Sequence, residues 1–299
     1  MTRLTYTILD VFTSTLFLGN PLAIVRVPME LREKITQSRK QTIAREFNLS
    51  ETVFLHEGNP DEPLEIDIFT ADMELPFAGH PTIGTGCYLL SRNQTRDTVS
   101  LRTKAGDIPV TRGSTPGTVK LCVPTNFKIH PSHPQLRTKA LQLGLVASDY
   151  VNGLEGSEPV ASIVKGMTFL LLEVSSEAAL GRLQPTPERP NAPPGLGEWG
   201  DFVGLYAFYE RGDGVLRTRM FDRTLEDPAT GSAASTLCGW LAKTRKGEGK
   251  HTFSILQGVE IGRKSEIEVT VEISKDGEIE KIELGGAAVE VMEGSLVAF

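Results

Sequence analysis

The chain is poor in the residues that build metal clusters and disulfide frameworks. Its 299 residues include three cysteines and five histidines. The cysteines, Cys87, Cys122 and Cys238, are odd in number and widely spaced, so the pattern indicates neither a disulfide framework nor a zinc site. A dinucleotide-binding fingerprint following a strand is also missing from the sequence. We therefore expect no metal and no organic cofactor.

Long apolar runs and clustered positive charge are scarce as well. The first residues lack the apolar core of a signal peptide, and the run from Met167 to Leu172 is far too short to cross a bilayer. The formal net charge is −7, which disfavours nucleic acid and anionic membranes as partners. With 39% hydrophobic residues the chain can bury a substantial core. We expect a cytoplasmic, globular protein whose length suits two domains.

One short pattern occurs twice in the chain. Residues 68–80 align without a gap on residues 220–232, at an offset of 152 residues. The matching pairs at this offset are Phe69 and Phe221, Glu74 and Glu226, Pro76 and Pro228, Gly79 and Gly231, Leu89 and Leu241, and Gly106 and Gly258. An offset near half of the chain length predicts two structurally similar halves of an α/β (α+β) fold, with a site between them. The repeat could also be only the remnant of a duplication.

Each copy of the pattern predicts a strand, a loop and then a helix. Residues 64–69 alternate apolar and acidic side chains, which is typical of a strand with one buried face. Pro81 suits the first turn of the following helix. In the second copy Ser232 is the predicted N-cap, and Gly231 allows close approach of the backbone. The N–H groups at both helix starts would stabilise a carboxylate or an enolate-like oxygen. Simple capping would explain a single copy better, whereas two copies in register favour a shared ligand site.

Elements outside the repeat support a duplicated α/β fold. Alternating residues over 267–273 and an extended stretch over 278–284 flank Asp276-Gly277 and predict a hairpin. A last strand around residues 296–299 could return to the first half. An early amphipathic helix that ends near Asn48 is predicted by apolar residues at helical spacing, namely Leu31, Ile35, Ile43 and Phe47.

The symmetry of the repeat is broken at one carboxylate. Glu51 lies where a helix gives way to a strand, and the same offset places Val203 in the second half. Because Val53 and Phe54 look buried, we expect Glu51 to have a raised pKa and to be able both to accept and to donate a proton. Taken alone, the segment fits a solvated or capping glutamate better.

Four segments, which occur in the same order and span most of the chain, together resemble the phenazine-biosynthesis (PhzF-like) family. They are Gly19-Asn20-Pro21-Leu22-Ala23-Ile24-Val25, Leu49-Ser50-Glu51-Thr52, Glu74-Leu75-Pro76-Phe77-Ala78-Gly79-His80-Pro81-Thr82 and Glu226-Asp227-Pro228-Ala229-Thr230-Gly231-Ser232-Ala233.

The resemblance implies a fold like that of diaminopimelate epimerase. Each of two pseudo-symmetric halves would be a curved, mostly antiparallel sheet around a central helix, with the active site in the cleft between the halves. The expected halves are residues 1–126 with the returning strand 288–299, and residues 127–287. A homodimer is also implied by the resemblance.

The resemblance also implies roles for individual residues. Glu51 matches the family's catalytic acid/base, which moves a proton between ring carbons of a dihydro-hydroxyanthranilate. Asn20 either holds a loop at the cleft or only makes the turn suggested by Gly19-Asn20-Pro21. The expected substrate-binding residues are His80, Asp227, Ser232, Gly79, Gly231 and Asn20.

The expected activity is cofactor-independent isomerisation, by general acid/base catalysis, of a small carboxylated molecule such as a dihydro-hydroxyanthranilate. An amino-acid or hydroxy-acid racemase or epimerase is one alternative, and a catalytically silent binding or regulatory protein of the same fold is another. Cofactor-independent epimerases of this fold use paired cysteines where this chain has Ala78 and Thr230, which disfavours a two-thiol mechanism. Residues 222–225 differ from the small, glycine-containing loop of many relatives, so the substrate stays open.

Overall fold

The computed structural model of this chain describes residues 2–59 and 61–298. Two compact units are distinguished, Met1–Cys122 with Gly285–Phe299 and Val123–Leu284. The boundaries expected from the sequence, after residues 126 and 287, lie a few residues further along the chain. Each unit is a mixed α/β structure in which sheet predominates.

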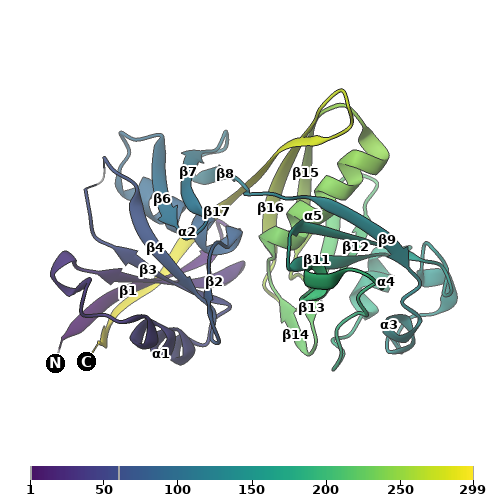
Figure 1. The fold of residues 1–299 in the computed structure, drawn as a ribbon, viewed down its shortest axis with the longest axis horizontal. Coiled ribbons are helices and arrows are strands. Elements are labelled where there is room, and N and C mark those ends of the chain that lie inside the picture. Colours follow the sequence, from purple (N-terminus) through teal and green to yellow (C-terminus); the bar gives the residue numbers. More distant parts are fainter. Residues whose placement is uncertain (1, 60, 299) are drawn as a thin grey trace. The chain divides into compact units, whose positions relative to one another are not determined.

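The elements of both units are shown in Figure 1. The first unit holds β1 (Arg3–Val11), β2 (Asn20–Val27), η1 (Met29–Leu31), α1 (Gln37–Phe47), β3 (Glu51–His56), β4 (Leu64–Phe69), β5 (Glu74–Leu75), α2 (Gly79–Arg92), β6 (Thr98–Thr103), β7 (Gly106–Arg112) and β8 (Thr118–Cys122). The second holds β9 (Lys128–His133), α3 (Leu136–Ala140), η2 (Ala147–Asp149), β10 (Glu158–Val164), β11 (Met167–Glu173), α4 (Glu177–Arg182), η3 (Gly197–Gly200), β12 (Val203–Glu210), β13 (Leu216–Asp222), β14 (Leu225–Asp227), α5 (Gly231–Leu241), η4 (Ala242–Lys246), β15 (Gly249–Gln257) and β16 (Ser265–Ile273). The segment between α4 and η3 is a long connection without helix or strand. The last strand, β17 (Ile279–Val297), begins in the second unit and ends in the first.

Helix α2 is the buried centre of the first unit. It contacts β1, β2, β3, β6, β7 and β8, and most of its residues are buried (Figure 1). Small residues allow this close enclosure. A Cβ atom on Gly84 would lie 2.5 Å from Leu22 Cδ2, and one on Gly86 would lie 2.4 Å from Val110 Cγ1. Helix α5 is buried in the same way in the second unit, where it contacts β10, β11 and β16.

The two copies of the sequence pattern form the same elements in the same register. Phe69 on β4 faces Glu74 on β5, and Phe221 on β13 faces Glu226 on β14. Helices α2 and α5 then begin at residues that are 152 apart, Gly79 and Gly231. The parallel pairs β2–β3 and β4–β6 of the first unit correspond to β11–β12 and β13–β15 of the second.

Two helix starts differ from the prediction. The N-cap of α5 is Thr230, so Ser232, the predicted cap, lies within the first turn. Helix α1 begins only at Gln37, after the N-cap Thr36, whose hydroxyl accepts a hydrogen bond from the Arg39 N–H group. Leu31, at the end of η1, and Ile35, in the segment before α1, produce the apolar spacing that predicts an earlier start. Both pack against the same core as α1 although they lie outside the helix. The predicted end at Asn48 is confirmed, because that residue is the left-handed C-cap.

The predicted hairpin arm and the first two residues of the predicted last strand, 296 and 297, are parts of one strand, β17. Residue 299 of that prediction lies outside the described residues. Its turn is closed by the Gly277 N–H group, which donates to Ser274 O at 3.0 Å. Further on, β17 pairs with β1 in an antiparallel register from Ala288↔Val11 to Val297↔Arg3. The returning strand therefore brings the two ends of the described chain together in the first unit (Figure 1).

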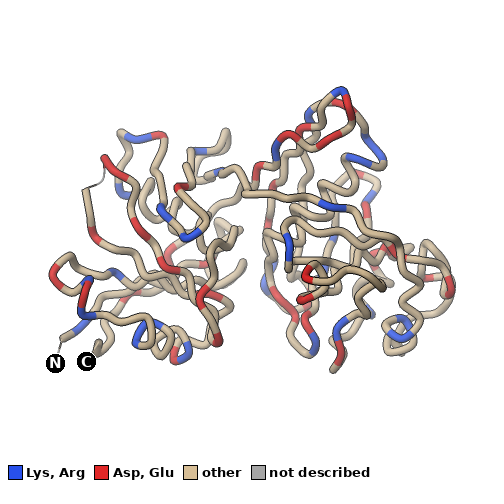
Figure 2. The backbone as a smooth tube through the Cα atoms, in the orientation of Figure 1, with Lys and Arg blue, Asp and Glu red and all other residues tan. Residues whose placement is uncertain are grey.

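Acidic and basic residues are interspersed over both units (Figure 2). Among the described residues, no helix is both long enough and apolar enough to cross a membrane.

Candidate active site

Glu51 and His80 form a close pair in the first unit. Glu51 is the first residue of β3 and faces Leu22 on β2, while His80 lies in the first turn of α2. The Nδ1 atom of His80 lies 2.9 Å from Oε2 of Glu51. The Glu51 side chain is 18% exposed and that of His80 only 4%, so Glu51 is the more accessible member of a largely buried pair. Two segments far apart in the sequence thus meet in one acid–base pair.

The second ring nitrogen of His80 fixes the number of protons in this pair. Its Nε2 lies 3.2 Å from the carbonyl oxygen of Asn20, which can only accept a hydrogen bond. Nε2 must therefore carry a hydrogen, and in a neutral ring Nδ1 would then be an acceptor. A hydrogen bond between Nδ1 and Glu51 requires one proton between them, either on the carboxyl group or on the ring. The pair can accordingly give up a proton or receive one with little rearrangement.

The pKa of Glu51 is lowered, which contradicts the expectation from the sequence. Burial by itself raises the pKa of this carboxyl group, as expected. The hydrogen bond and the positive charge of His80, with a smaller contribution from a hydrogen bond of Ser50, outweigh burial and bring the pKa below its ordinary value. The ionised form of Glu51 is therefore favoured. The sequence could not indicate this sign because His80 is 29 residues away along the chain.

Asn20 supports the pair rather than only making a turn. It is the first residue of β2 and is 2% exposed. Besides accepting from His80, it accepts a hydrogen bond from the Ser50 hydroxyl through Oδ1 at 3.3 Å. Since Ser50 has one hydroxyl proton and also contacts Glu51, it can shift its bond between the amide and the carboxylate. Asn20, at the start of β2, and Ser50, just before β3, hold the pair in place.

The start of α2 offers donors beside the carboxylate. Within the described part of the chain, the N–H groups of Gly79 and His80 have no hydrogen-bond partner, and the N-cap Ala78 has no side chain that could cap them. Such N–H groups attract anions, and the helix dipole adds to this. The first unit thus combines a base with a place for negative charge.

The second unit presents a different polar set on the equivalent backbone. Asp227 ends β14, and Ser232 and Gly231 lie in the first turn of α5. In the residues that the structure describes, the amide groups of Gly231 and Ser232 have no hydrogen-bond partner. Asp227 Oδ2 accepts a hydrogen bond from the Thr230 hydroxyl at 2.5 Å. The residues expected from the sequence are therefore gathered in two groups, one in each unit.

Three residues of the second group were missed from the sequence. Gln257 donates to the carbonyl oxygen of Asp227 at 2.8 Å and to Thr230 Oγ1 at 3.0 Å. Tyr206 donates to Gln257 Oε1 at 3.1 Å. From the sequence, Thr230 is distinguished only as the residue that replaces a cysteine of the epimerases. A lone glutamine at a strand end carries no spacing signal that sequence reasoning could use.

The two cysteines in the central helices are buried core residues and belong to neither polar group. Cys87 and Cys238 are buried in α2 and α5, as predicted for small core residues. Burial raises the pKa of the Cys87 thiol to about 12 and raises the pKa of Cys238 well above its ordinary value. Neither sulfur is available as a thiolate near neutral pH.

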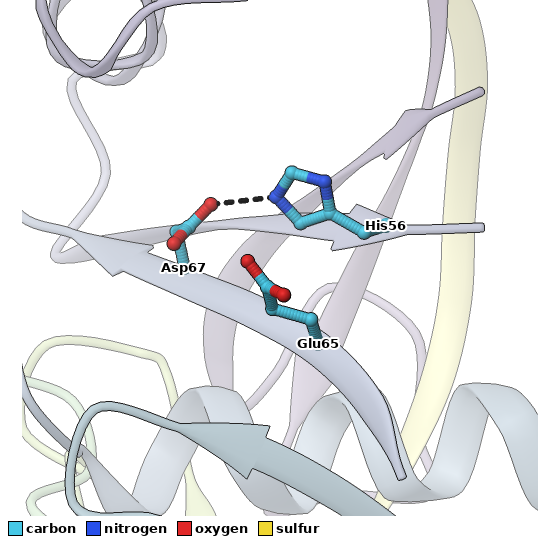
Figure 3. Close-up of side chains that lie close together, drawn as sticks. All are labelled: His56, Glu65 and Asp67. Atoms are coloured by element: carbon cyan, nitrogen blue, oxygen red, sulfur yellow. Dashed lines mark hydrogen bonds and ion pairs between the residues drawn. The ribbon is translucent and has the colours of Figure 1, made fainter. Parts of the chain in front are cut away.

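A cluster of side chains that could ligate a metal, His56, Glu65 and Asp67, is held by ion pairs instead (Figure 3). Asp67 Oδ2 lies 2.7 Å from His56 Nε2 and also accepts from the Lys40 ammonium group, while Glu65 pairs with Arg32. Lys40 already supplies the positive charge that a metal would bring.

The fold and the two polar groups define a class of protein: a duplicated, mostly sheet α/β chain in which a carboxylate on a strand pairs with a histidine at the start of one buried helix. Comparison with known proteins agrees with this class. The family described as "Phenazine biosynthesis-like protein" matches residues 9–294. The trans-2,3-dihydro-3-hydroxyanthranilate isomerase of Pseudomonas aeruginosa is 33% identical, over 97% of this chain and 98% of its own length.

Solved structures show the same fold. A PhzF-family phenazine biosynthesis protein of Bacillus anthracis superposes with a TM-score of 0.81 at 23% identity, covering 99% of this chain and all of the other. A hydroxyproline epimerase of Agrobacterium vitis has a TM-score of 0.62 at 11% identity, with coverage of 98% and 92%. The chain belongs to the PhzF-like isomerase family, within the diaminopimelate epimerase-like fold.

Proposed function

We propose that this chain is a cofactor-independent isomerase that moves a proton between two carbons of a small carboxylated molecule, with Glu51 as the general acid/base. The observation that supports this proposal best is the Glu51–His80 pair, whose geometry requires one shared proton and whose Glu51 side chain is partly accessible. The trans-2,3-dihydro-3-hydroxyanthranilate isomerases among its relatives suggest the first substrate to test.

The proposed reaction needs one base that also returns the proton. The Glu51 carboxylate removes a proton from a substrate carbon, and the electron pair moves through the adjacent double bonds. The protonated Glu51 then delivers the proton to a second carbon. The lowered pKa keeps Glu51 ionised at the start of this cycle and makes its protonated form a better proton donor in the second half, and the positive charge of His80 stabilises the carboxylate between turnovers.

Asp227, Ser232 and the N–H groups at the two helix starts are proposed to orient the same substrate. Negative charge that develops on the substrate during proton removal would be stabilised by donors that are already in place, such as the N–H groups of Gly79 and Gly231. The repeat supports this part of the proposal, since both units offer the same kind of helix start.

A two-thiol racemase mechanism finds no support in this chain. Its two thiols would have to stand just before the glycines of α2 and α5, where Ala78 and Thr230 are found. The buried thiols of Cys87 and Cys238 have pKa values raised by burial and cannot take that role near neutral pH.

The test is proton exchange in D2O. The parent protein should isomerise trans-2,3-dihydro-3-hydroxyanthranilate, or another member of a panel of cyclic and acyclic carboxylated compounds, with deuterium entering at carbon as observed by NMR. Glu51→Gln keeps the size of the side chain but loses the titratable proton, so turnover should fall by about two to four orders of magnitude. Substrate binding, measured by calorimetry, should change little.

Glu57→Gln is the matched control, because Glu57 is exposed just beyond the other end of β3. It should turn over substrate at the parent rate. Parental turnover by a folded Glu51→Gln protein would contradict the role of Glu51. Inversion of a stereocentre without movement of a double bond would favour the epimerase alternative, and ligand binding with no deuterium exchange would favour a silent binding protein.

A further inference from the structure

A series of hydrogen bonds leads from the buried interior of the second unit to Asp227. Thr230 Oγ1 lies 2.5 Å from Asp227 Oδ2 and 3.0 Å from Gln257 Nε2. Gln257 Oε1 receives the Tyr206 hydroxyl at 3.1 Å and the Thr230 N–H group at 3.4 Å. Gln257 and Tyr206 are completely buried, so water does not compete for these bonds.

Two backbone groups fix the direction of donation along this series of hydrogen bonds. The Thr230 N–H group can only donate and therefore faces Oε1 of Gln257, whereas the Asp227 carbonyl can only accept and therefore faces Nε2. The same Nε2 donates to the Thr230 hydroxyl oxygen. The one hydroxyl proton of Thr230 is then directed to Asp227 Oδ2, which favours the ionised carboxylate.

Tyr206 reinforces this direction from the other side of Gln257. Burial raises the pKa of Tyr206 well above its ordinary value, so its hydroxyl keeps its proton. The Thr218 hydroxyl lies 3.0 Å from the Tyr206 oxygen and can donate to it, which leaves the Tyr206 proton for Gln257. Oε1 of Gln257 is thereby held as an acceptor, and Nε2 as the donor to Thr230.

The fold does not need this chain of bonds. In the first unit, Leu75 faces Ile68 on β4, as Asp227 faces Met220 on β13. Ala78 stands at the N-cap of α2, as Thr230 does for α5. The same strand, loop and helix form there from apolar side chains. The Thr230 hydroxyl does not cap α5 either, so helix capping does not explain its presence.

We propose that Thr230 and Gln257, supported by Tyr206, are positioning residues that hold the Asp227 carboxylate ionised and in one orientation for a donor group of the substrate, an amine or a hydroxyl. The proposal rests on the proposed function of the site. It assigns a purpose to three residues of the second unit that do not themselves carry out proton transfer.

The sharpest test compares Thr230→Val with Thr230→Ser. Valine keeps the shape of the side chain without the hydroxyl, whereas serine keeps the hydroxyl. A hydrogen bond to a charged group is lost in Thr230→Val, so kcat/KM should fall about 10- to 100-fold and its acid limb should move to higher pH. Thr230→Ser should stay within about threefold of the parent, with both melting temperatures within about 3 °C of it. Equal loss in both variants, or parental kinetics in Thr230→Val, would overturn the proposal.

Gln257→Glu tests the direction of donation. The replacement has the same size, but it presents an acceptor where Nε2 was a donor, so it draws the Thr230 proton away from Asp227. Kinetics like those of Thr230→Val are expected, and the double variant should lose little more than either single one, because both changes remove the same bond. Fully additive losses would contradict a shared pathway through Thr230.

A readout that needs no turnover separates this proposal from the proposed function. With ¹³C-labelled aspartate, the carboxyl signal of Asp227, assigned with Asp227→Asn, is followed as a function of pH. Protonation of Asp227 should occur at a pH about one unit higher in Thr230→Val than in the parent or in Thr230→Ser. If no compound is isomerised but this difference is found, the isomerase function fails and the positioning role stands. An unchanged titration in Thr230→Val overturns the positioning role whatever the activity.

Discussion

At the scale of single residues, the chemistry of the site depends on what surrounds Glu51. A buried carboxyl group without partners would have a raised pKa and would stay protonated, unable to act first as a base. His80 reverses that sign through a hydrogen bond and a charge. The important variable is therefore the neighbour from α2 rather than burial itself.

Removal of His80 should restore the effect of burial. In His80→Ala the remaining influences on Glu51 are burial, which raises its pKa, and the smaller contribution of Ser50, which lowers it. In the parent, kcat/KM should hold as the pH falls to about the ordinary glutamate pKa of 4.5, because Glu51 stays ionised there. In His80→Ala the acid limb should move upward in pH. A measured pH profile with an unmoved acid limb would contradict the role assigned to His80.

Replacing either buried thiol should lower stability without changing turnover, in contrast to His80→Ala. Cys87→Ala and Cys238→Ala each remove one sulfur atom from a buried helix, so the free energy of unfolding should fall by about 1 to 2 kcal/mol through lost packing. Turnover of the folded proteins should match the parent, since neither thiol ionises near neutral pH. Chemical denaturation and steady-state kinetics measure the two effects separately. A folded cysteine variant without activity would favour the epimerase reading instead.

At the scale of elements, α1 is fixed to the sheet by a buried ion-pair cluster. Lys40 of α1 and His56 of β3 both bond to Asp67 of β4, and all three side chains are nearly inaccessible. Burial raises the pKa of Asp67, but the hydrogen bonds and charges of His56 and Lys40 outweigh it and lower the pKa to about 2. A depressed carboxyl pKa stabilises the folded state above the unfolded pKa, and this contribution is lost as the pH falls through the folded one.

Asp67→Asn should therefore destabilise the first unit at neutral pH. It leaves the Lys40 charge buried without its counter-ion, which costs about 3 to 5 kcal/mol of unfolding free energy. The parent should lose the stabilisation from Asp67 between about pH 3.8 and about pH 2, whereas the variant should show no such loss in that range. Denaturation measured at neutral pH and at pH 3 tests this. Equal stability of parent and variant at neutral pH would count against the cluster.

The elements of the repeat were the most predictable part of the structure. Alternation over β4 and the glycines at the start of α2 and α5 depend on local chemistry, so the sequence indicated them correctly. The N-cap of α5 was misassigned because Thr230 and Ser232 both have capping chemistry, and only the tertiary fold decides where the helix begins. Gln257 was missed because its partners lie 27 and 30 residues earlier in the chain. Residues that act across long sequence separations leave no periodic pattern.

At the scale of the whole molecule, the duplication explains how one backbone pattern came to carry two kinds of chemistry. The first copy has Leu75 where the second has Asp227, and the second has Ser232 where the first has His80. Each unit keeps the buried helix and its free N–H groups but has its own acid. The base proposed for one unit and the orienting carboxylate proposed for the other are what a one-base isomerase needs, whereas a symmetric racemase needs like groups in both.

If both groups act on one substrate, a single ligand must perturb both helix starts together. We expect the amide NMR signals of Gly79 and Gly231 to shift with one common dissociation constant and one ligand per chain when a carboxylated substrate is added to Glu51→Gln, which binds without turnover. Glu57→Gln, with the same change in charge and an intact base, should show both shifts together with conversion of the substrate. Two different affinities, or a shift at only one of the helices, would contradict a shared site, because N–H groups that bind the same anion must respond to it with the same occupancy.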